Sequence, residues 1–163
     1  FDHVGAGLVT KPGGPGVASV LKLRVSPGVR VVTATLPPMK GKRETILSQA
    51  FRRKVNGLGE RALDDAISDH TFDGMLAAGR AFADGLGLET PSLKRLIKAS
   101  MESGAMASSQ NMVGDSIHAI VPKEGVERVV QTLRSVSDVA RVDVFRIGGK
   151  SARTIIRKST KID

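Results

Sequence analysis

The chain has 163 residues, a formal net charge of +9 at pH 7, 40% hydrophobic residues and no cysteine. This length fits one domain, or one domain with a piece of a second, and it can bury a core without disulfides. The lack of cysteine excludes disulfide scaffolds, thiol nucleophiles and cysteine metal sites. No apolar run approaches the roughly 20 residues of a membrane-spanning helix. We therefore expect a soluble, cytoplasmic protein.

The charge is unevenly distributed along the chain. Residues 1–54 carry a net charge of +8, residues 55–110 of −3 and residues 111–163 of +4. Basic ends attract anions, whether nucleotide phosphates, a carboxylate substrate or a nucleic-acid backbone. Tyrosine and tryptophan are absent, and three of the five phenylalanines fall on helical apolar stripes, so few rings remain for base stacking.

The first third of the chain has the pattern of β-strands. Apolar runs separated by glycine and proline predict strands over 4–10, 17–25 and 31–36. Pro37-Pro38 ends the third of these, because proline has no N–H to donate to a neighbouring strand.

From Arg43 to Met101 the apolar spacing changes to that of helices and predicts four of them. The first stripe includes Phe51, and the second runs from Ala62 to Ile67. The third stripe runs from Phe72 to Phe82. For the fourth helix, Thr90 is the expected N-cap and Pro91 the first helical residue.

The last third predicts a small-residue connection followed by strands and a helix. The connection covers 103–114, the strands 117–121, 141–147 and 151–157, and the helix 126–136. We expect the strands near 31–36, 117–121 and 141–147 to share one sheet, covered by the helices that lie between them.

Several familiar chemistries are missing from the sequence. It contains no Walker A loop, no dinucleotide-binding fingerprint and no nucleophile elbow. His3, His70 and His118 lack the spacing of zinc ligands, so we expect no metal site on them.

Two glycine-containing segments remain as candidates. Residues 11–16 form either a tight turn, which we favour, or a backbone platform for an anion. Residues 104–115 form either a close-packed turn or a segment whose Ser108, Ser109 and Asn111 donate hydrogen bonds to phosphate or hydroxyl oxygens.

A series of short matches in the right order resembles the archaeal pantoate kinases of the GHMP kinase superfamily. The matches are Gly7-Leu8-Val9, the turn at 11–16, Leu36-Pro37-Pro38 with Lys42, Ile46 and Leu47, the segment Val55–Leu63, and Ala107–Ile117, which resembles the third GHMP motif. The resemblance implies an α+β fold: a GHMP-kinase C-terminal domain at 29–163, with a ferredoxin-like sheet and helices packed on one face, preceded at 1–28 by the last strands of the N-terminal domain.

The resemblance also implies an activity. A small-molecule kinase of this family transfers phosphate from ATP, with Mg²⁺, to the hydroxyl of pantoate and gives 4-phosphopantoate for coenzyme A biosynthesis. The family's Pro-x-x-x-Gly-Leu-Gly-Ser-Ser loop, which wraps the ATP phosphates, has no match here, and the chain begins at Phe1. We therefore expect the natural polypeptide to extend upstream with that loop, and the isolated chain to be inactive.

The site implied by the resemblance lies in the third motif. Substrate or phosphate contacts are expected at Gly104, Ser108, Ser109, Asn111 and Gly114, while no catalytic base is identified. Lys42 and Arg43, at the start of a helix, either join these contacts or form a solvated basic patch. The expected partners are pantoate and ATP. We expect no association with a membrane, and whether the protein forms a homodimer is left open.

Two other functions remain open on the sequence. The first is a basic α+β module that binds RNA or DNA, and its affinity would fall steeply with salt. The second is a non-catalytic regulator that senses a carboxylic acid. Fold class alone does not decide between these functions and a kinase.

Overall fold

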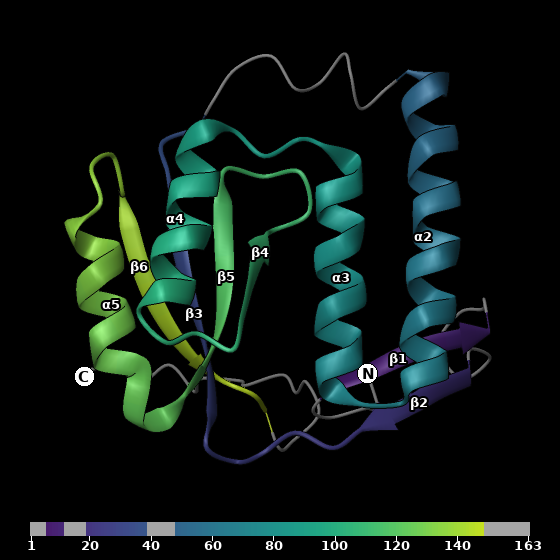
Figure 1. Cartoon of the computed structure of the whole chain (residues 1–163), viewed down its shortest axis with the longest axis horizontal. Coiled ribbons are helices and arrows are strands. Elements are labelled where there is room, and N and C mark those ends of the chain that lie inside the picture. The colour runs from purple at the N-terminus through teal and green to yellow at the C-terminus, as the bar shows by residue number, and fades with distance from the viewer. Residues whose placement is uncertain (1–5, 12–18, 39–47, 149–163) are drawn as a thin grey trace, which may run out of the picture.

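The computed structural model describes residues 6–11, 19–38 and 48–148, which form two sheets and four α-helices (Figure 1). A two-stranded antiparallel sheet pairs β1 (Ala6–Lys11) with β2 (Ser19–Leu23). A four-stranded antiparallel sheet has the order β4-β5-β3-β6. Its strands are β3 (Val29–Thr35), β4 (Ala107–Gln110), β5 (Ser116–Pro122) and β6 (Arg141–Arg146).

The larger sheet has the ferredoxin-like arrangement, in which β3 lies between β5 and β6 and β4 lies outside β5. Val32 pairs with Ala119 on one side and with Val144 on the other. The expected sharing of one sheet by these three strands is therefore confirmed, as is the α+β class.

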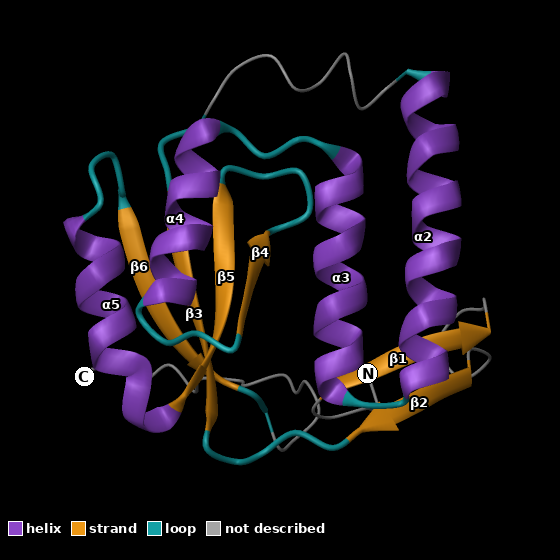
Figure 2. Cartoon of the chain, viewed as in Figure 1, coloured by secondary structure: helices purple, strands orange, loops and turns teal. Residues whose placement is uncertain are grey.

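The core lies between this sheet and two helices, α4 (Pro91–Glu102) and α5 (Val126–Ser135), which cover one face of it (Figure 2). Residues at alternate positions of β3 and β5 point to these helices and are fully buried. The largest fully buried side chains are Leu93, Leu96, Ile117, Leu133, Val32, Val121 and Val129. The predicted buried faces of both helices are confirmed.

The cap of α4 also follows the prediction. The Thr90 hydroxyl accepts a hydrogen bond of 3.3 Å from the Leu93 N–H, and Pro91 occupies the first turn, where a missing N–H costs nothing.

The expectation of two helices at the first two apolar stripes is corrected for the described residues, because Phe51 and the stripe at 62–67 belong to one helix, α2 (Gln49–Asp69); Ile46 and Leu47 of the first stripe lie outside the described residues. Gly57 and Gly59 within it do not end the helix. A Cβ at Gly59 would lie 3.8 Å from the Phe82 ring on α3 (Phe72–Leu86), an ordinary van der Waals contact, so this glycine faces α3 without being required by its packing. Tertiary packing outweighs the low helix propensity of glycine.

The placement of the helices differs in part from the expectation that all of them cover the sheet. Helices α2 and α3 pack against each other, and α3 flanks the outer edge of β4 (Figure 1). Helix α2 also contacts β1 of the two-stranded sheet, at its lower end in Figure 1, and extends past α3 at the opposite end. This arrangement leaves α3 beside an edge strand rather than over the sheet.

The connection expected at 103–114 is also wrong in part, since Ala107–Gln110 form strand β4. Four small or polar residues gave no strand signal, and pairing with β5 supplies the structure. The strand expected at 151–157 and the turn at 12–16 lie outside the described residues. No helix among the described residues is long and apolar enough to cross a membrane.

Candidate functional site

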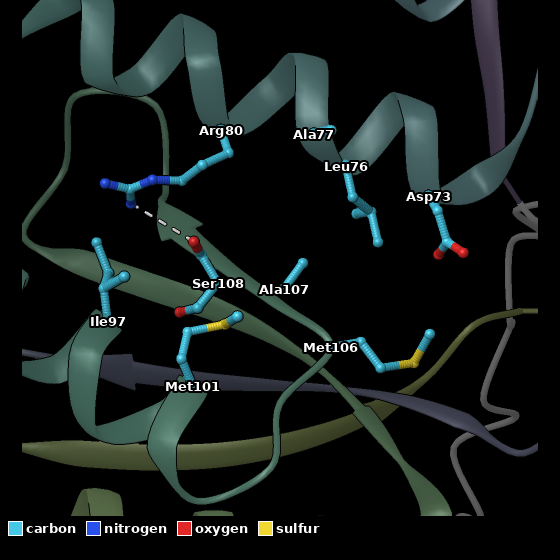
Figure 3. Close-up of a pocket in the computed structure, with 9 residues that line it drawn as sticks. All are labelled: Asp73, Leu76, Ala77, Arg80, Ile97, Met101, Met106, Ala107 and Ser108. Carbon is cyan, nitrogen blue, oxygen red and sulfur yellow. Dashed lines mark hydrogen bonds between the residues drawn. The ribbon is translucent and has the colours of Figure 1, made fainter. Parts of the chain in front are cut away.

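A groove between α3 and β4 is the main concave feature around the predicted third-motif segment. One cavity of about 410 Å³ is lined by α3, the end of α4 and the start of β4 (Figure 3). An adjoining cavity of about 300 Å³ continues along β4 to the β4–β5 turn. Both cavities share Leu76, Arg80, Ala107 and Ser108, so they form one continuous groove, here called the α3–β4 groove.

Arg80 projects from α3 into the middle of this groove (Figure 3). Its Nη1 donates to Glu89 Oε1 at 2.8 Å and its Nη2 to Glu89 Oε2 at 3.1 Å, a two-pronged ion pair. Its Nε donates to Asp84 Oδ2 at 3.0 Å, and Nη1 also reaches the Ser108 carbonyl at 3.5 Å. Arg80 therefore ties α3, the α3–α4 connection and the outer edge of β4 together.

Glu89 and Asp84 stabilise the positive charge of Arg80. Burial lowers the pKa of Arg80, but hydrogen bonds and charge attraction from Glu89 and Asp84 outweigh this and leave the pKa above its ordinary value. The Glu89 side chain is only 3% exposed, whereas that of Asp84 is 54% exposed. The ion pair with Glu89 is thus the shielded one.

The β4–β5 hairpin carries a network of polar side chains beside the groove. The buried Ser108 hydroxyl donates to the His118 carbonyl at 3.1 Å, and buried Gln110 donates to the Gly114 carbonyl at 2.8 Å. Asn111 bonds Ser116 Oγ at 3.0 Å and lies 2.8 Å from His118 Nδ1. These bonds fix the shape of the turn between the two strands.

His118 lines the far end of the groove from β5. Its burial lowers its pKa below the ordinary value of 6.5, so the ring is neutral at pH 7. A neutral imidazole has one ring nitrogen that accepts hydrogen bonds.

The structure brings together four of the residues predicted for the site. Ser108 and Ser109 lie on β4 and are buried, and Asn111 and Gly114 lie in the turn that follows. The Ser108 hydrogen is already donated to the backbone of β5. Direct donation to a phosphate from these side chains stays a prediction.

The remaining predicted residues lie elsewhere. Gly104 precedes the opposite end of β4 with φ of 105°, a conformation that favours glycine, and a Cβ there would clash with the Arg128 guanidinium. Arg128 Nε donates to the Ser103 carbonyl at 2.6 Å, so Gly104 makes room for a structural contact. Lys42 and Arg43 lie outside the described residues.

The groove also contains residues that the sequence analysis did not select. Arg80 had one signal in the sequence, a carboxylate four residues ahead at Asp84, but its bonds to Glu89 and Ser108 depend on the tertiary fold. His118 gave no signal, because its partner Asn111 faces it only across the hairpin.

The His, Asp and Glu side chains of the described residues are dispersed. Within the described ranges, no three His, Asp or Glu side chains gather closely enough to hold a metal. These residues therefore form no all-protein metal site, whereas Mg²⁺ bound together with a nucleotide needs only one or two carboxylates.

The fold is of the same class as that of small-molecule kinases of known structure. One solved structure, a phosphotransferase related to the CoA biosynthesis pathway, is 22% identical with a TM-score of 0.73, and the match covers 88% of this chain and 46% of that chain. The mevalonate kinase of Staphylococcus aureus MRSA252 is 19% identical with a TM-score of 0.53, over 82% of this chain and 46% of that one.

A third structure is MDDEF in complex with MVAPP, AMPPCP and magnesium; it is 14% identical with a TM-score of 0.50, over 74% of this chain and 47% of that chain. At these identities the matches show a shared fold. The chain spans about half the length of each of these three proteins. No protein-family model matches the sequence, and comparison with curated proteins gave no significant match.

Proposed function

We propose that this chain forms part of an ATP-dependent kinase that phosphorylates the hydroxyl group of a small carboxylic acid, with pantoate as the substrate. The observation that supports the proposal is the fold likeness, at a TM-score of 0.73 over 88% of the chain, to a phosphotransferase related to the CoA biosynthesis pathway. The segment Ala107–Ile117, which resembles the third GHMP motif, forms the β4–β5 hairpin beside the α3–β4 groove.

In this proposal the chain divides near residue 28. Residues 1–28, with β1 and β2, belong to the end of an N-terminal domain, and residues 29–163 form the C-terminal domain. ATP and Mg²⁺ are the expected cofactors, and one neighbour of this fold is a complex with AMPPCP and magnesium. Mg²⁺ bound with a nucleotide takes most of its ligands from phosphates and water, so the lack of a three-ligand cluster among the described residues agrees with this expectation.

The role assigned to the described residues is the positioning of groups near the transferred phosphate. Phosphoryl transfer depends mainly on positioning and charge stabilisation, so a rigid turn beside the phosphate is useful. The turn at 111–115 is fixed by the Gln110 and Asn111 side chains. Gly114 lies in this turn, where an added Cβ would be 3.3 Å from the Asn111 carbonyl oxygen.

The test is an ADP-release assay on the polypeptide encoded by the whole gene, with ATP, Mg²⁺ and pantoate. We expect ADP release that depends on pantoate and is not supported by mevalonate. Absence of pantoate-dependent turnover in a folded, complete enzyme would reject the substrate. Binding to RNA or DNA with a steep salt dependence would instead favour the nucleic-acid alternative, which the structural neighbours do not support.

A matched pair of variants tests the role of the turn. Gly114→Val crowds the Asn111 carbonyl and is expected to lower kcat by roughly tenfold or more, as displacement of positioning groups does. Gly28→Val, in the turn before β3, meets only Ser26 Oγ at 3.7 Å and is expected to leave kcat within about twofold, as surface changes usually do. Equal kcat for the two variants at equal melting temperature would remove the turn from the site.

A further inference from the structure

A second cavity lies on the other side of the start of α3, away from the β4–β5 turn. It measures about 540 Å³ and is bounded by the end of β2, the chain that follows it, and the connection between α2 and α3. Figure 2 shows the end of β2 beside the first turn of α3. The lining residues are Lys22, Arg24, Ser26, Val29, His70, Thr71, Phe72, Asp73 and Met106. We call it the β2–α3 cavity.

Two exposed cationic residues from the same stretch of chain, Lys22 and Arg24, line this cavity. Residues two apart in an extended chain lie on the same side, so both charges face the same space. Among the described residues, neither side chain has an ion-pair or hydrogen-bond partner, unlike Arg80 and Arg141.

One carboxylate, that of Asp73, lines the cavity with these two cations. It lies in the first turn of α3, where the helix dipole favours a negative charge, and it also lines the neighbouring α3–β4 groove (Figure 3). The formal charge of the lining, with histidine taken as neutral, is therefore positive.

The polar groups are accompanied by an apolar wall. Val29, Phe72 and Met106 come from β3, α3 and the start of the β4 region. The volume is far larger than a single inorganic anion needs and falls within the usual range for small-molecule sites. The lining therefore suits a molecule that has both an anionic group and an apolar body.

We propose that the β2–α3 cavity binds a small organic phosphate monoester. Lys22 and Arg24 neutralise the phosphate, while Phe72, Val29 and Met106 pack against the organic part. A phosphate monoester carries nearly two negative charges at pH 7 and has several acceptor oxygens, so it can bond Lys22 and Arg24 at the same time, although Asp73 reduces the formal charge of the lining to +1. The planar guanidinium of Arg24 can also donate two parallel hydrogen bonds to phosphate oxygens. The inference does not rest on the proposed kinase function.

Calorimetric titration of the full chain with three probes tests the chemistry of the site. Phenyl phosphate carries both the dianion and the apolar body, benzoate replaces the dianion by a carboxylate, and inorganic phosphate lacks the body. We expect phenyl phosphate to bind at least about tenfold more tightly than either of the others, since each lacks one set of contacts. Equal affinity for all three probes, or no saturable binding of phenyl phosphate, would overturn the proposal.

Two double variants locate the binding. K22A/R24A is expected to weaken phenyl phosphate binding by about tenfold or more, because both charge-assisted contacts are lost. K94A/R95A removes the same charge from the exposed face of α4 and is expected to change the dissociation constant by less than about twofold. If both double variants weaken binding equally at unchanged circular dichroism, net charge rather than the cavity explains the affinity, and the site is rejected. None of these measurements requires kinase turnover.

Discussion

Arg80 has a structural role at the centre of the α3–β4 groove, because its charge is paired with Glu89. Glu89 is shielded from water and accepts two hydrogen bonds from Arg80. A group bound in this way is not free to bind a substrate anion unless one carboxylate moves away. The charge of Arg80 therefore holds α3 against β4 and shapes the groove.

Loss of the Arg80 side chain should be strongly destabilising. Arg80→Ala leaves the Glu89 carboxylate nearly buried without its partner, and we expect the free energy of unfolding to fall by about 3 kcal/mol. Asp84→Ala removes the solvent-exposed partner and should cost less than about 1 kcal/mol. Urea denaturation of both variants measures the difference, and equal losses would show that burial of Glu89 does not matter.

His118 gives the protein a dependence of stability on pH. Because burial lowers the pKa of His118 in the folded state, the unfolded chain binds a proton first as pH falls through about 6.5. The contribution of neutral His118 to the free energy of unfolding is present above that pH and is lost progressively below it. We expect the free energy of unfolding of the wild type to fall between about pH 6.5 and pH 5.

A histidine variant separates this effect from other titrations. His118→Asn should flatten the pH dependence in that window, whereas the wild type should keep it. Denaturation at pH 5, 6 and 7.5 provides the measurement. An unchanged slope in His118→Asn would assign the pH dependence to other groups.

At the scale of single elements, helix glycines act in two different ways. Cβ atoms added at Gly57 and Gly79 would meet nothing within 4 Å, whereas one at Gly85 would lie 2.7 Å from Leu58 Cδ2 on α2. Gly85 therefore has a packing role between α2 and α3 that the other two lack.

This difference predicts that alanine changes the free energy of unfolding differently at Gly79 and at Gly85. Gly79→Ala should stabilise the protein by about 0.5–1 kcal/mol, because alanine loses less conformational freedom in a helix. Gly85→Ala should gain less or destabilise, since Leu58 must shift. Thermal unfolding of the two variants at one pH would compare them directly, and equal stabilisation would mean that the contact between the helices is soft.

The elements that the sequence predicts well are those with strong local signals. Helices α4 and α5 have a clear apolar face, and α4 has the Thr90 cap and Pro91. Strand β4 has none of these signals, because its structure comes from pairing with β5 and from the Ser108 hydroxyl bond to the backbone of that strand. The α3–β4 groove could not be predicted for the same reason: its walls meet only after the fold is complete.

For the whole molecule, the main core and the α2–α3 pair are separate packing units. The main core consists of residues from the four-stranded sheet, α4 and α5 with their adjoining loops, and it includes none from α2 or α3. The buried residues of those two helices are few: Ala66 in α2, and Ala78, Ala83 and Leu86 in α3. Units with little buried apolar surface open at lower free energy.

We expect hydrogen exchange to reveal this division. Amides of β3 and β5 should exchange only through global unfolding, while those of α2 should exchange through a lower-energy opening. Phe82→Ala, at the contact between α2 and α3, should speed exchange in α2 without changing that in β5. Leu133→Ala, in the main core, should speed exchange everywhere, and a uniform response to both variants would show a single cooperative unit.

The central position of β3 in the sheet has a consequence for how the chain folds as it is synthesised. Both partners of β3 come after the described helices α2, α3 and α4 in the sequence, so β3 cannot pair in the sheet until β5 and then β6 have left the ribosome. Contacts between such distant segments form slowly, because a long loop must close before they stabilise the chain. The β4–β5 hairpin, whose strands are neighbours in sequence, is positioned to form first and to serve as the template on which β3 docks.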